Sequence, residues 1–232
     1  MQSPYLGVDV WLVKSSAGVR RADLDLLSNA EQRRVARFHR TQDAALFTTA
    51  RAALRRRLGA VIGVPPREVR LLDPPGAKPH LEGQQGTLSF SVSHSVDRAL
   101  IALCDGGRVG VDLERVEPVP SALLETALTE AERQWIAGLP EAVRHRAFYQ
   151  FWTRKEALLK AVGTGLATDM KEVRLSATDP PRLLDWPHGP ACDWQLRNLF
   201  VGADWEAVAV VEAQERAVRM RLHPPHPADG ES

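Results

Sequence analysis

The chain has 232 residues, of which 44% are hydrophobic and 25% charged, as is typical of a soluble globular protein long enough to bury a core. Its formal net charge of +1 provides no general attraction to nucleic acid or to a membrane surface. Cys104 and Cys192 are the only cysteines, too few for a disulfide framework or a zinc site, so we expect a cytoplasmic protein.

The predicted elements begin with a strand. Residues 1–13 contain an apolar run that includes Asp9, has no basic leader and is too short to span a membrane. The capping-box pattern at 28–31 predicts a helix that continues, in one or two pieces, until Gly59 or Gly63 stops it. A short strand is then predicted at 68–72 and a loop at 76–86. A strand region that is broken around 93–95 is predicted at 88–103, and a turn at 105–107.

After this turn the order of motifs begins again. Residues 6–10 (LGVDV) match residues 109–113 (VGVDL), and the capping box recurs at 128–132. The tetrapeptide EVRL is repeated letter for letter at 68–71 and 172–175. This spacing of about 100 residues predicts a mixed α+β protein made of two copies of one β-α-β unit. We expect a pseudo-twofold axis and a ligand cleft between the copies. The predicted units are 1–106, 107–222 and a disordered, Pro-rich tail at 223–232.

Three carboxylates of the second copy are candidates for a metal site. Asp112 and Glu114 are two residues apart, so on a strand both face the same side. Trp152, Glu156 and Lys160 recur every fourth residue and share one face of a helix. Together the carboxylates offer the oxygen ligands that Mg²⁺ prefers and leave coordination positions for substrate phosphates. Lys160 would point at these phosphates. The alternative is structural, namely an exposed Glu156–Lys160 ion pair and a solvated strand face.

The first copy lacks most of these acids. Trp11 stands where Glu114 does in the second copy, and Ala52 stands where Glu156 does. Carboxylates that served only the fold would be expected in both copies. Their restriction to the second copy therefore favours a functional site there.

Four motifs in this order resemble the 4'-phosphopantetheinyl transferases. Residues 110–114 (GVDLE) and 152–160 (WTRKEALLK) are similar to the family signature. Residues 76–81 (GAKPHL) and 90–95 (FSVSHS) resemble motifs of its long, internally duplicated subgroup, typified by the surfactin synthetase activator. The resemblance implies this family's fold and a Mg²⁺-dependent transfer of phosphopantetheine from coenzyme A to a serine of an apo acyl or peptidyl carrier protein. It also implies a monomer, since the short subgroup is trimeric.

The resemblance assigns roles to residues as well. Asp112, Glu114 and Glu156 would hold the metal, and Glu156 or a water that it orients would take the serine proton. Lys160 would steady the pyrophosphate and the leaving group, so Glu156, Lys160 and Asp112 form the expected catalytic set.

The expected contacts with coenzyme A are with its phosphates. Ser93 and His94 would meet them, together with Lys160, and Lys78 and Arg51 would lie nearby. His94 could alternatively be a satisfied core histidine.

Two other functions remain open from the sequence. A Mg²⁺-dependent nucleotide hydrolase could use the same three carboxylates, with water as the nucleophile. A non-catalytic nucleic-acid-binding module could use the arginine-rich first long helix. The small net charge and the aromatic content of 6% argue against the second alternative, so we expect no nucleic-acid partner.

Overall fold

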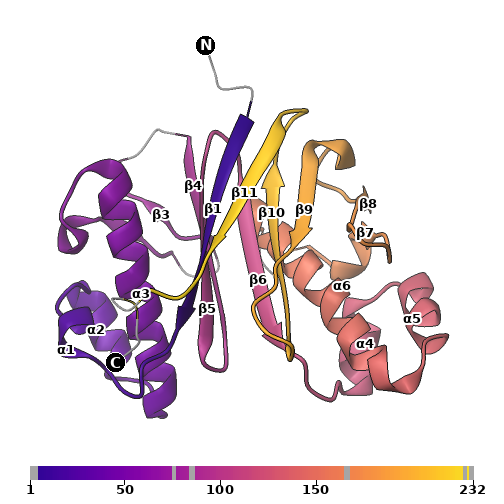
Figure 1. The fold of residues 1–232 in the computed structure, drawn as a ribbon, viewed down its shortest axis with the longest axis horizontal. Coiled ribbons are helices and arrows are strands. Elements are labelled where there is room, and N and C mark those ends of the chain that lie inside the picture. The colour runs from indigo at the N-terminus through magenta and orange to yellow at the C-terminus, as the bar shows by residue number, and fades with distance from the viewer. Residues whose placement is uncertain (1–4, 75–76, 84–86, 165–167, 227–228, 230–232) are drawn as a thin grey trace.

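The computed structural model describes residues 5–74, 77–83, 87–164, 168–226 and 229. Figure 1 shows four layers, with a long helix on each outer side and two small sheets between them. The predicted α+β class is therefore confirmed.

The elements follow one another in the same order in both halves. The first half contains β1 (Tyr5–Lys14), α1 (Arg21–Leu24), α2 (Asn29–Val35), α3 (Thr41–Ile62), β2 (Leu71–Leu72), β3 (His80–Leu81), β4 (Leu88–Ser95) and β5 (Arg98–Asp105). The second half contains β6 (Val109–Arg115), α4 (Ser121–Ala127), α5 (Glu130–Ala137), α6 (Glu141–Val162), β7 (Arg174–Leu175), β8 (Leu183–Asp185), β9 (Trp194–Asn198), β10 (Trp205–Glu212) and β11 (Ala217–His223).

The sheet topology repeats between the halves. The first-half sheet has the order β11-β1-β5-β4 and the second has the order β6-β10-β9. The neighbouring pairs β1–β5, β5–β4, β6–β10 and β10–β9 are all antiparallel. Without β11, the two sheets are equivalent strand for strand, as the repeated motifs predict.

The caps predicted from the sequence are present at both equivalent helix starts. Ser28 accepts a hydrogen bond from the Glu31 backbone, and the Glu31 side chain accepts one from the Ser28 backbone. Thr129 and Glu132 form the same reciprocal pair at α5. Each of these caps satisfies two backbone donors that the helix itself cannot.

The two long helices stop at equivalent glycines. α3 and α6 have 22 residues each and end at Gly63 and Gly163, with φ of 75° and 82°. This left-handed conformation is unfavourable for residues with a side chain. Gly59 lies inside α3, where a Cβ would be 2.6 Å from the Val64 carbonyl oxygen.

Some strand boundaries differ from the prediction. β4 continues through 93–95, and the chain turns only at Val96, which has a φ of 54°. Residues 66–68 form a 3₁₀ turn, so the strand predicted at 68–72 is shortened to Leu71–Leu72.

The inner faces of the two sheets pack against each other. Val8 and Val10 of β1 and Val111 and Leu113 of β6 belong to the same buried cluster. α3 covers the outer face of the first sheet, and α6 covers that of the second. Because Val111 and Leu113 point inward, Asp112 and Glu114 face α6, as the alternation of a strand requires.

The C-terminal strand does not follow the predicted units. β11 pairs in parallel with β1 of the first half, from Tyr5↔Ala217 to Trp11↔His223. His223, predicted to begin a disordered tail, instead ends this strand and stacks on Trp11 with ring centroids 4.9 Å apart. Asp229 is also ordered: it is 2% exposed and pairs with Arg57. The tail prediction is therefore wrong for these residues, and 227–228 and 230–232 lie outside the described part.

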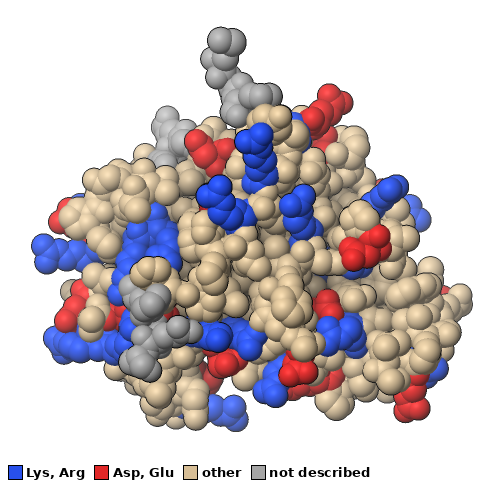
Figure 2. Space-filling view, viewed as in Figure 1, with Lys and Arg blue, Asp and Glu red and all other residues tan. Residues whose placement is uncertain are grey.

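The surface agrees with the modest net charge. On the face shown in Figure 2, basic and acidic side chains are interspersed over both halves. Neither sign of charge is confined to one half on this face. None of the described helices has the length and apolarity needed to cross a membrane.

Candidate active site

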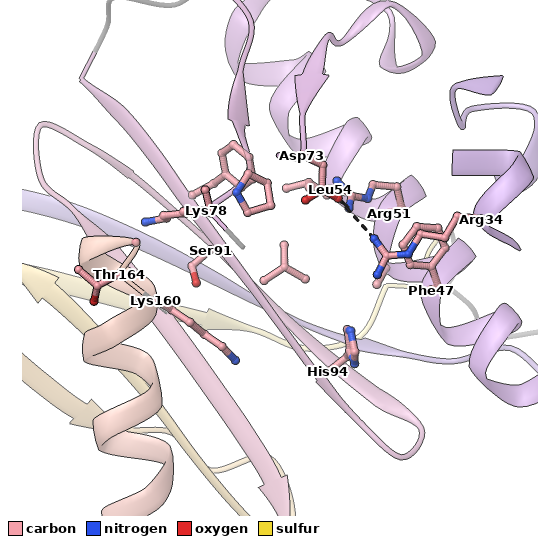
Figure 3. Close-up of a pocket in the computed structure, with 16 residues that line it drawn as sticks. Arg34, Phe47, Arg51, Leu54, Asp73, Lys78, Ser91, His94, Lys160 and Thr164 are labelled. Carbon is pink, nitrogen blue, oxygen red and sulfur yellow. Dashed lines mark hydrogen bonds and ion pairs between the residues drawn. The ribbon is translucent and has the colours of Figure 1, made fainter. Parts of the chain in front are cut away.

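A pocket of about 550 Å³ lies between the halves. The first half supplies residues from α3, from β4 and from the segment before β3, and the second half supplies Lys160, Gly163 and Thr164 at the end of α6. Figure 3 shows Lys160 at one side and Arg34 and Arg51 at the other. The predicted cleft between the copies is thus present, with positive charge at both ends.

Asp112 is the centre of a buried polar cluster at the Lys160 end. It is 1% exposed, and its Oδ1 accepts hydrogen bonds from Lys160 Nζ and Ser93 Oγ, each at 2.6 Å. Lys160 Nζ also donates to Ser93 Oγ at 2.9 Å. Burial raises the pKa of Asp112, and the nearby Lys160 opposes this shift. The cluster joins β4, β6 and α6, and so it connects both halves.

Glu114 lies beside this cluster on the same face of β6. Its Oε2 accepts a hydrogen bond of 2.7 Å from Ser95 Oγ. Burial, and then the negative charge of Asp112, raise the pKa of Glu114 to about 7, while hydrogen bonding by Ser95 opposes this shift. The ionised carboxylate is therefore poorly compensated by the protein alone.

Glu156 reaches the same region from α6. Burial raises the pKa of its carboxyl, the positive charge of Lys160 lowers it, and the negative charge of Asp112 raises it again. Lys160 forms its ion pair with Asp112, at 2.6 Å, so the alternative of a purely local Glu156–Lys160 surface pair is not what the structure shows. The three predicted acids thus influence one another electrostatically.

A close approach of β6 to α6 brings these groups together. A Cβ at position 110 would lie 1.9 Å from the Ala157 carbonyl oxygen, so only glycine fits there. Gly110 lies two residues before Asp112 on the strand, and Ala157 directly follows Glu156 on the helix. The glycine of the GVDLE motif is therefore what allows strand and helix to meet at the site.

The carboxylates fit a divalent cation by their chemistry. The described residues contain no group of three or more His, Cys, Asp or Glu already arranged as a metal site, and the Lys160 ammonium rests on Asp112. However, Asp112 Oδ2 is buried without a hydrogen-bond partner among the described atoms. Burial also raises the pKa of all three acids. A bound cation would supply the missing partner and reverse these shifts.

His94 lies near the end of β4 and lines the pocket. Its residue surface is exposed, so the alternative of a core histidine is wrong. Desolvation by the surrounding walls lowers the pKa of His94, and the positive charge of Lys160 lowers it further. Desolvation and the two cations Lys160 and Arg34 thus disfavour the protonated ring, while Asp112 acts in the opposite direction.

Lys78 forms contacts that the sequence did not predict. Its ammonium donates to the backbone oxygens of Val109 and Ala161, at 2.7 and 3.2 Å, and to Ser89 Oγ at 3.3 Å. Burial lowers the pKa of Lys78 to about 8. These bonds hold the first half to β6 and to the last turn of α6. A contact of Lys78 with a cofactor phosphate stays a prediction. It would require the phosphate to replace some of these hydrogen-bond partners of the ammonium.

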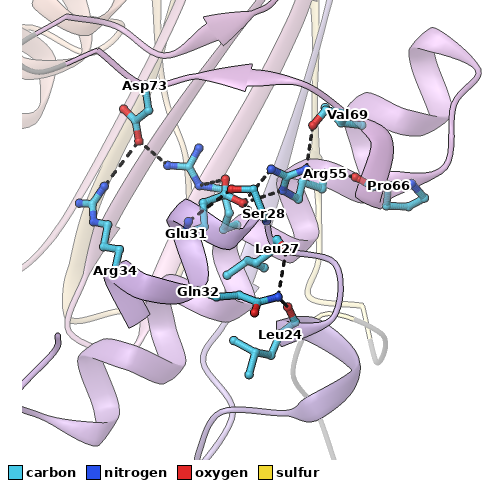
Figure 4. Close-up of polar contacts among 11 residues, drawn as sticks. Leu24, Leu27, Ser28, Glu31, Gln32, Arg34, Arg55, Pro66, Val69 and Asp73 are labelled. Carbon is cyan, nitrogen blue, oxygen red and sulfur yellow. Dashed lines mark hydrogen bonds and ion pairs between the residues drawn. The ribbon is translucent and has the colours of Figure 1, made fainter. Parts of the chain in front are cut away.

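The opposite end of the pocket contains an acid, Asp73, that the sequence did not single out. Asp73 Oδ2 lies 2.8 Å from Arg51 Nη2 and 3.5 Å from Arg34 Nη1, as Figure 4 shows for the second pair. The guanidinium carbons of Arg34 and Arg51 lie 4.7 and 5.5 Å from the centre of the Phe47 ring. Arg51 is thus at the pocket, as predicted, but already paired.

Ser93 was predicted to contact a cofactor phosphate, but the other serines of β4 were overlooked, although they carry a signal. Ser89, Ser91, Ser93 and Ser95 alternate along the strand. The first two accept hydrogen bonds from the Val109 and Val111 backbone at 3.2 Å, and the last two donate to the acids of β6. The period of two in these serines could have predicted a polar seam between the halves.

Comparisons with known proteins identify similar sequences for both halves. The profile of the 4'-phosphopantetheinyl transferase superfamily matches residues 108–219, and that of the N-terminal part of 4'-phosphopantetheinyl transferase matches residues 16–105. A solved structure, the holo-[acyl-carrier-protein] synthase of Thermotoga maritima, is 24% identical, with a TM-score of 0.39 over 46% of this chain and 63% of that one.

Two relatives establish the family. The putative 4'-phosphopantetheinyl transferase slr0495 of Synechocystis sp. is 34% identical over 71% of this chain and 68% of its own length. The 4'-phosphopantetheinyl transferase HetI of Nostoc sp. is 33% identical over 75% of this chain and 73% of its own length. The chain belongs to the 4'-phosphopantetheinyl transferase family and is an enzyme. The alternative of a non-catalytic binding module is therefore wrong.

Proposed function

We propose that this enzyme transfers the 4'-phosphopantetheine group of coenzyme A to a serine of an apo acyl or peptidyl carrier protein. The observation that carries the proposal is the charge distribution of the pocket between the halves. Lys160, paired with Asp112, lies at one end, and Arg34 and Arg51 lie at the other. Such a pocket suits a ligand with phosphates at both ends of a nucleoside, as in coenzyme A.

The acids would hold Mg²⁺. Asp112 and Glu114 from β6 and Glu156 from α6 are its proposed ligands, and Asp112 Oδ2 already lacks another partner among the described atoms. When bound, the ion would neutralise the diphosphate that is attacked.

The remaining chemistry belongs to side chains of this chain. Glu156 takes the proton of the carrier serine, directly or through a water that it orients. The serine oxygen then forms a bond to phosphorus, and the bond from phosphorus to adenosine 3',5'-bisphosphate breaks. Lys160 donates to the leaving phosphate and stabilises its charge, while Ser93 keeps the ammonium in place.

The middle and the far end of the pocket would hold the nucleotide. Leu54 and Val92 provide an apolar wall between the charged ends. His94 and Arg51 face the phosphates, with Arg34 at the rim. We also propose that the enzyme is a monomer, because one chain supplies both sides of the pocket.

The test is the mass of an apo carrier protein after incubation with the enzyme, Mg²⁺ and coenzyme A. A gain of one phosphopantetheine group is expected. Glu156→Gln should reduce the rate by about 100-fold or more, because it keeps the size of the side chain but removes its charge. The matched control is Glu172→Gln, at an exposed acid of the same half.

Two results would contradict the proposal. Release of adenosine 3',5'-bisphosphate from coenzyme A at full rate without a carrier would indicate the hydrolase alternative. Transfer by Glu156→Gln at the wild-type rate would remove this residue from the mechanism.

A further inference from the structure

The Arg34 and Arg51 end of the pocket already contains an anion supplied by the chain. Asp73 follows β2 directly, and its Oδ2 contacts both guanidinium groups, at 2.8 and 3.5 Å. All three residues line the pocket, so the carboxylate occupies space where a ligand would lie. Its side chain is 38% exposed, compared with 11% for Arg51. The acid is thus the more accessible member of the pair.

The duplication separates what the fold needs from what this site needs. The two long helices have the same length and end at the equivalent glycines Gly63 and Gly163, so Arg55 corresponds to Lys155. The capping-box acid Glu31 likewise corresponds to Glu132. Lys155 Nζ lies 2.6 Å from Glu132 Oε2 and is fully buried, while Arg55 Nη2 lies 2.7 Å from Glu31 Oε2 and is 3% exposed. A cation on the long helix held by the capping-box acid is therefore common to both halves.

Asp73 has no acidic counterpart in the second half. Its equivalent there is Ala177, which packs against the apolar core. In the register of the two long helices Arg51 corresponds to Phe151, a core residue, so the second half has neither charge of this pair. Asp73 is therefore an addition that is specific to the pocket.

We propose that Asp73 is a built-in substitute for a ligand phosphate and that it sets the specificity of this subsite. The inference rests on the proposed function, in which the ligand is coenzyme A. A phosphate monoester carries about −1.5 to −2 charges and three acceptor oxygens, so it displaces a single carboxylate from the guanidinium pair. A ligand without this phosphate leaves Asp73 in place.

The surroundings of Arg51 allow this exchange. When Asp73 leaves, Glu31 still holds Arg51 Nε, and Glu31 is itself fixed by Arg55 at 2.7 Å and by its helix cap (Figure 4). The guanidinium therefore stays oriented toward the pocket. The cost to the ligand is the ion pair that it breaks.

The test is calorimetric binding of coenzyme A and of 3'-dephospho-coenzyme A to the full chain. Asp73→Asn should tighten coenzyme A binding by about two- to fivefold, the range for loss of a partly exposed competing ion pair. Binding of the dephospho compound should change by less than about twofold, because it does not enter the subsite. Asp73→Ser should behave like Asp73→Asn. The matched control is Glu82→Gln, which neutralises an acid that pairs with Arg70 at 3.4 Å outside the pocket.

The outcomes distinguish this inference from the proposed function. Weaker coenzyme A binding by both Asp73 variants, at unchanged melting temperature, would show that Asp73 positions the arginines and would overturn the inference. The inference would also be overturned if the Asp73 variants gained equal affinity for both ligands, or if Glu82→Gln gained the same affinity for coenzyme A. Failure of the wild-type chain to bind coenzyme A would instead contradict the proposed function.

Discussion

At the scale of single residues, the site is defined by charges that the protein compensates only in part. Asp112 uses one oxygen for Lys160 and Ser93 and leaves the other buried without a partner among the described atoms. Arg51 is paired at two sides, whereas His94 is kept neutral by desolvation and by neighbouring cations. The pKa values of groups in such surroundings shift strongly when a phosphate or a cation binds next to them.

His94 should therefore take up a proton when coenzyme A binds. Its pKa is below 6.5 in the free enzyme, and an adjacent phosphate raises it, so at pH 6.5 the complex holds more protons than its components. The affinity then falls as the pH rises through the pKa of the complex. Binding heats in two buffers of different ionisation enthalpy would measure the uptake.

The control for this prediction is the variant His94→Gln, which should bind without the His94 contribution to proton uptake. Its loss of affinity should be about 1.5–3 kcal/mol, the value of one charge-assisted hydrogen bond. The same uptake in the variant would show that another group titrates. A lower melting temperature with unchanged affinity would give His94 a structural role only.

Residue periodicity predicted which acids share a face, but not every partner. Strand alternation places Asp112 and Glu114 together, and the helical repeat places Glu156 near Lys160. Asp73 and Lys78 lie in segments around two-residue strands, where no periodicity applies. Their contacts depend on how the chain returns from the core, which is decided by packing rather than by local sequence.

At the scale of elements, the decisive feature is the contact of β6 with α6. The backbone of Gly110 touches the backbone of Ala157, so this strand and this helix are closer than side chains would allow. In the first half the equivalent glycine is Gly7, where an added Cβ would meet nothing within 4 Å among the described residues. The same motif therefore carries different constraints in the two halves.

Gly110→Ala should consequently destabilise the protein far more than Gly7→Ala. A methyl group at 110 collides with the backbone of α6, which should lower the free energy of unfolding by about 3 kcal/mol or more. At position 7 the change should stay within about 1 kcal/mol, since alanine loses less conformational entropy than glycine when a strand forms. Denaturant unfolding of the two variants is the measurement. Equal losses would mean that strand and helix are farther apart at Gly110 than this contact implies.

At the scale of the whole molecule, duplication has produced two similar halves and one reacting centre. In the first half, Asp9 pairs with His223 at 2.6 Å, and Trp11 stacks on the same ring. The positions equivalent to the metal ligands are thus occupied by a different set of contacts. The sequence predicted this asymmetry because the first copy retains only Asp9, the counterpart of Asp112, and lacks acids equivalent to Glu114 and Glu156.

We therefore predict one metal site per chain. Titration with Mn²⁺ as a paramagnetic substitute, in the presence of coenzyme A, should saturate near one equivalent, because two or more carboxylates are needed to hold such an ion beside phosphates. The double variant Asp112→Ala with Glu114→Ala should lose this binding. Two equivalent tight sites, or binding that survives the double change, would show that the first half also holds metal.

The sequence could not predict where the last strand lies. The pattern of residues 217–223 is compatible with a strand, but its partner is more than 200 positions away along the chain. Nothing local selects between β1 and the edge of the second sheet. Pairing over such distances is decided by the shape of the assembled core.

The position of β11 also affects how the protein is made. On a ribosome, β1 emerges first and its outer edge has no strand to pair with until residues 217–223 have been synthesised. The first half therefore completes its sheet only after the second half has emerged. For the same reason, a cut in the turn at 105–107 would not release the halves as separate pieces. The ladder between β1 and β11 would still fasten one to the other.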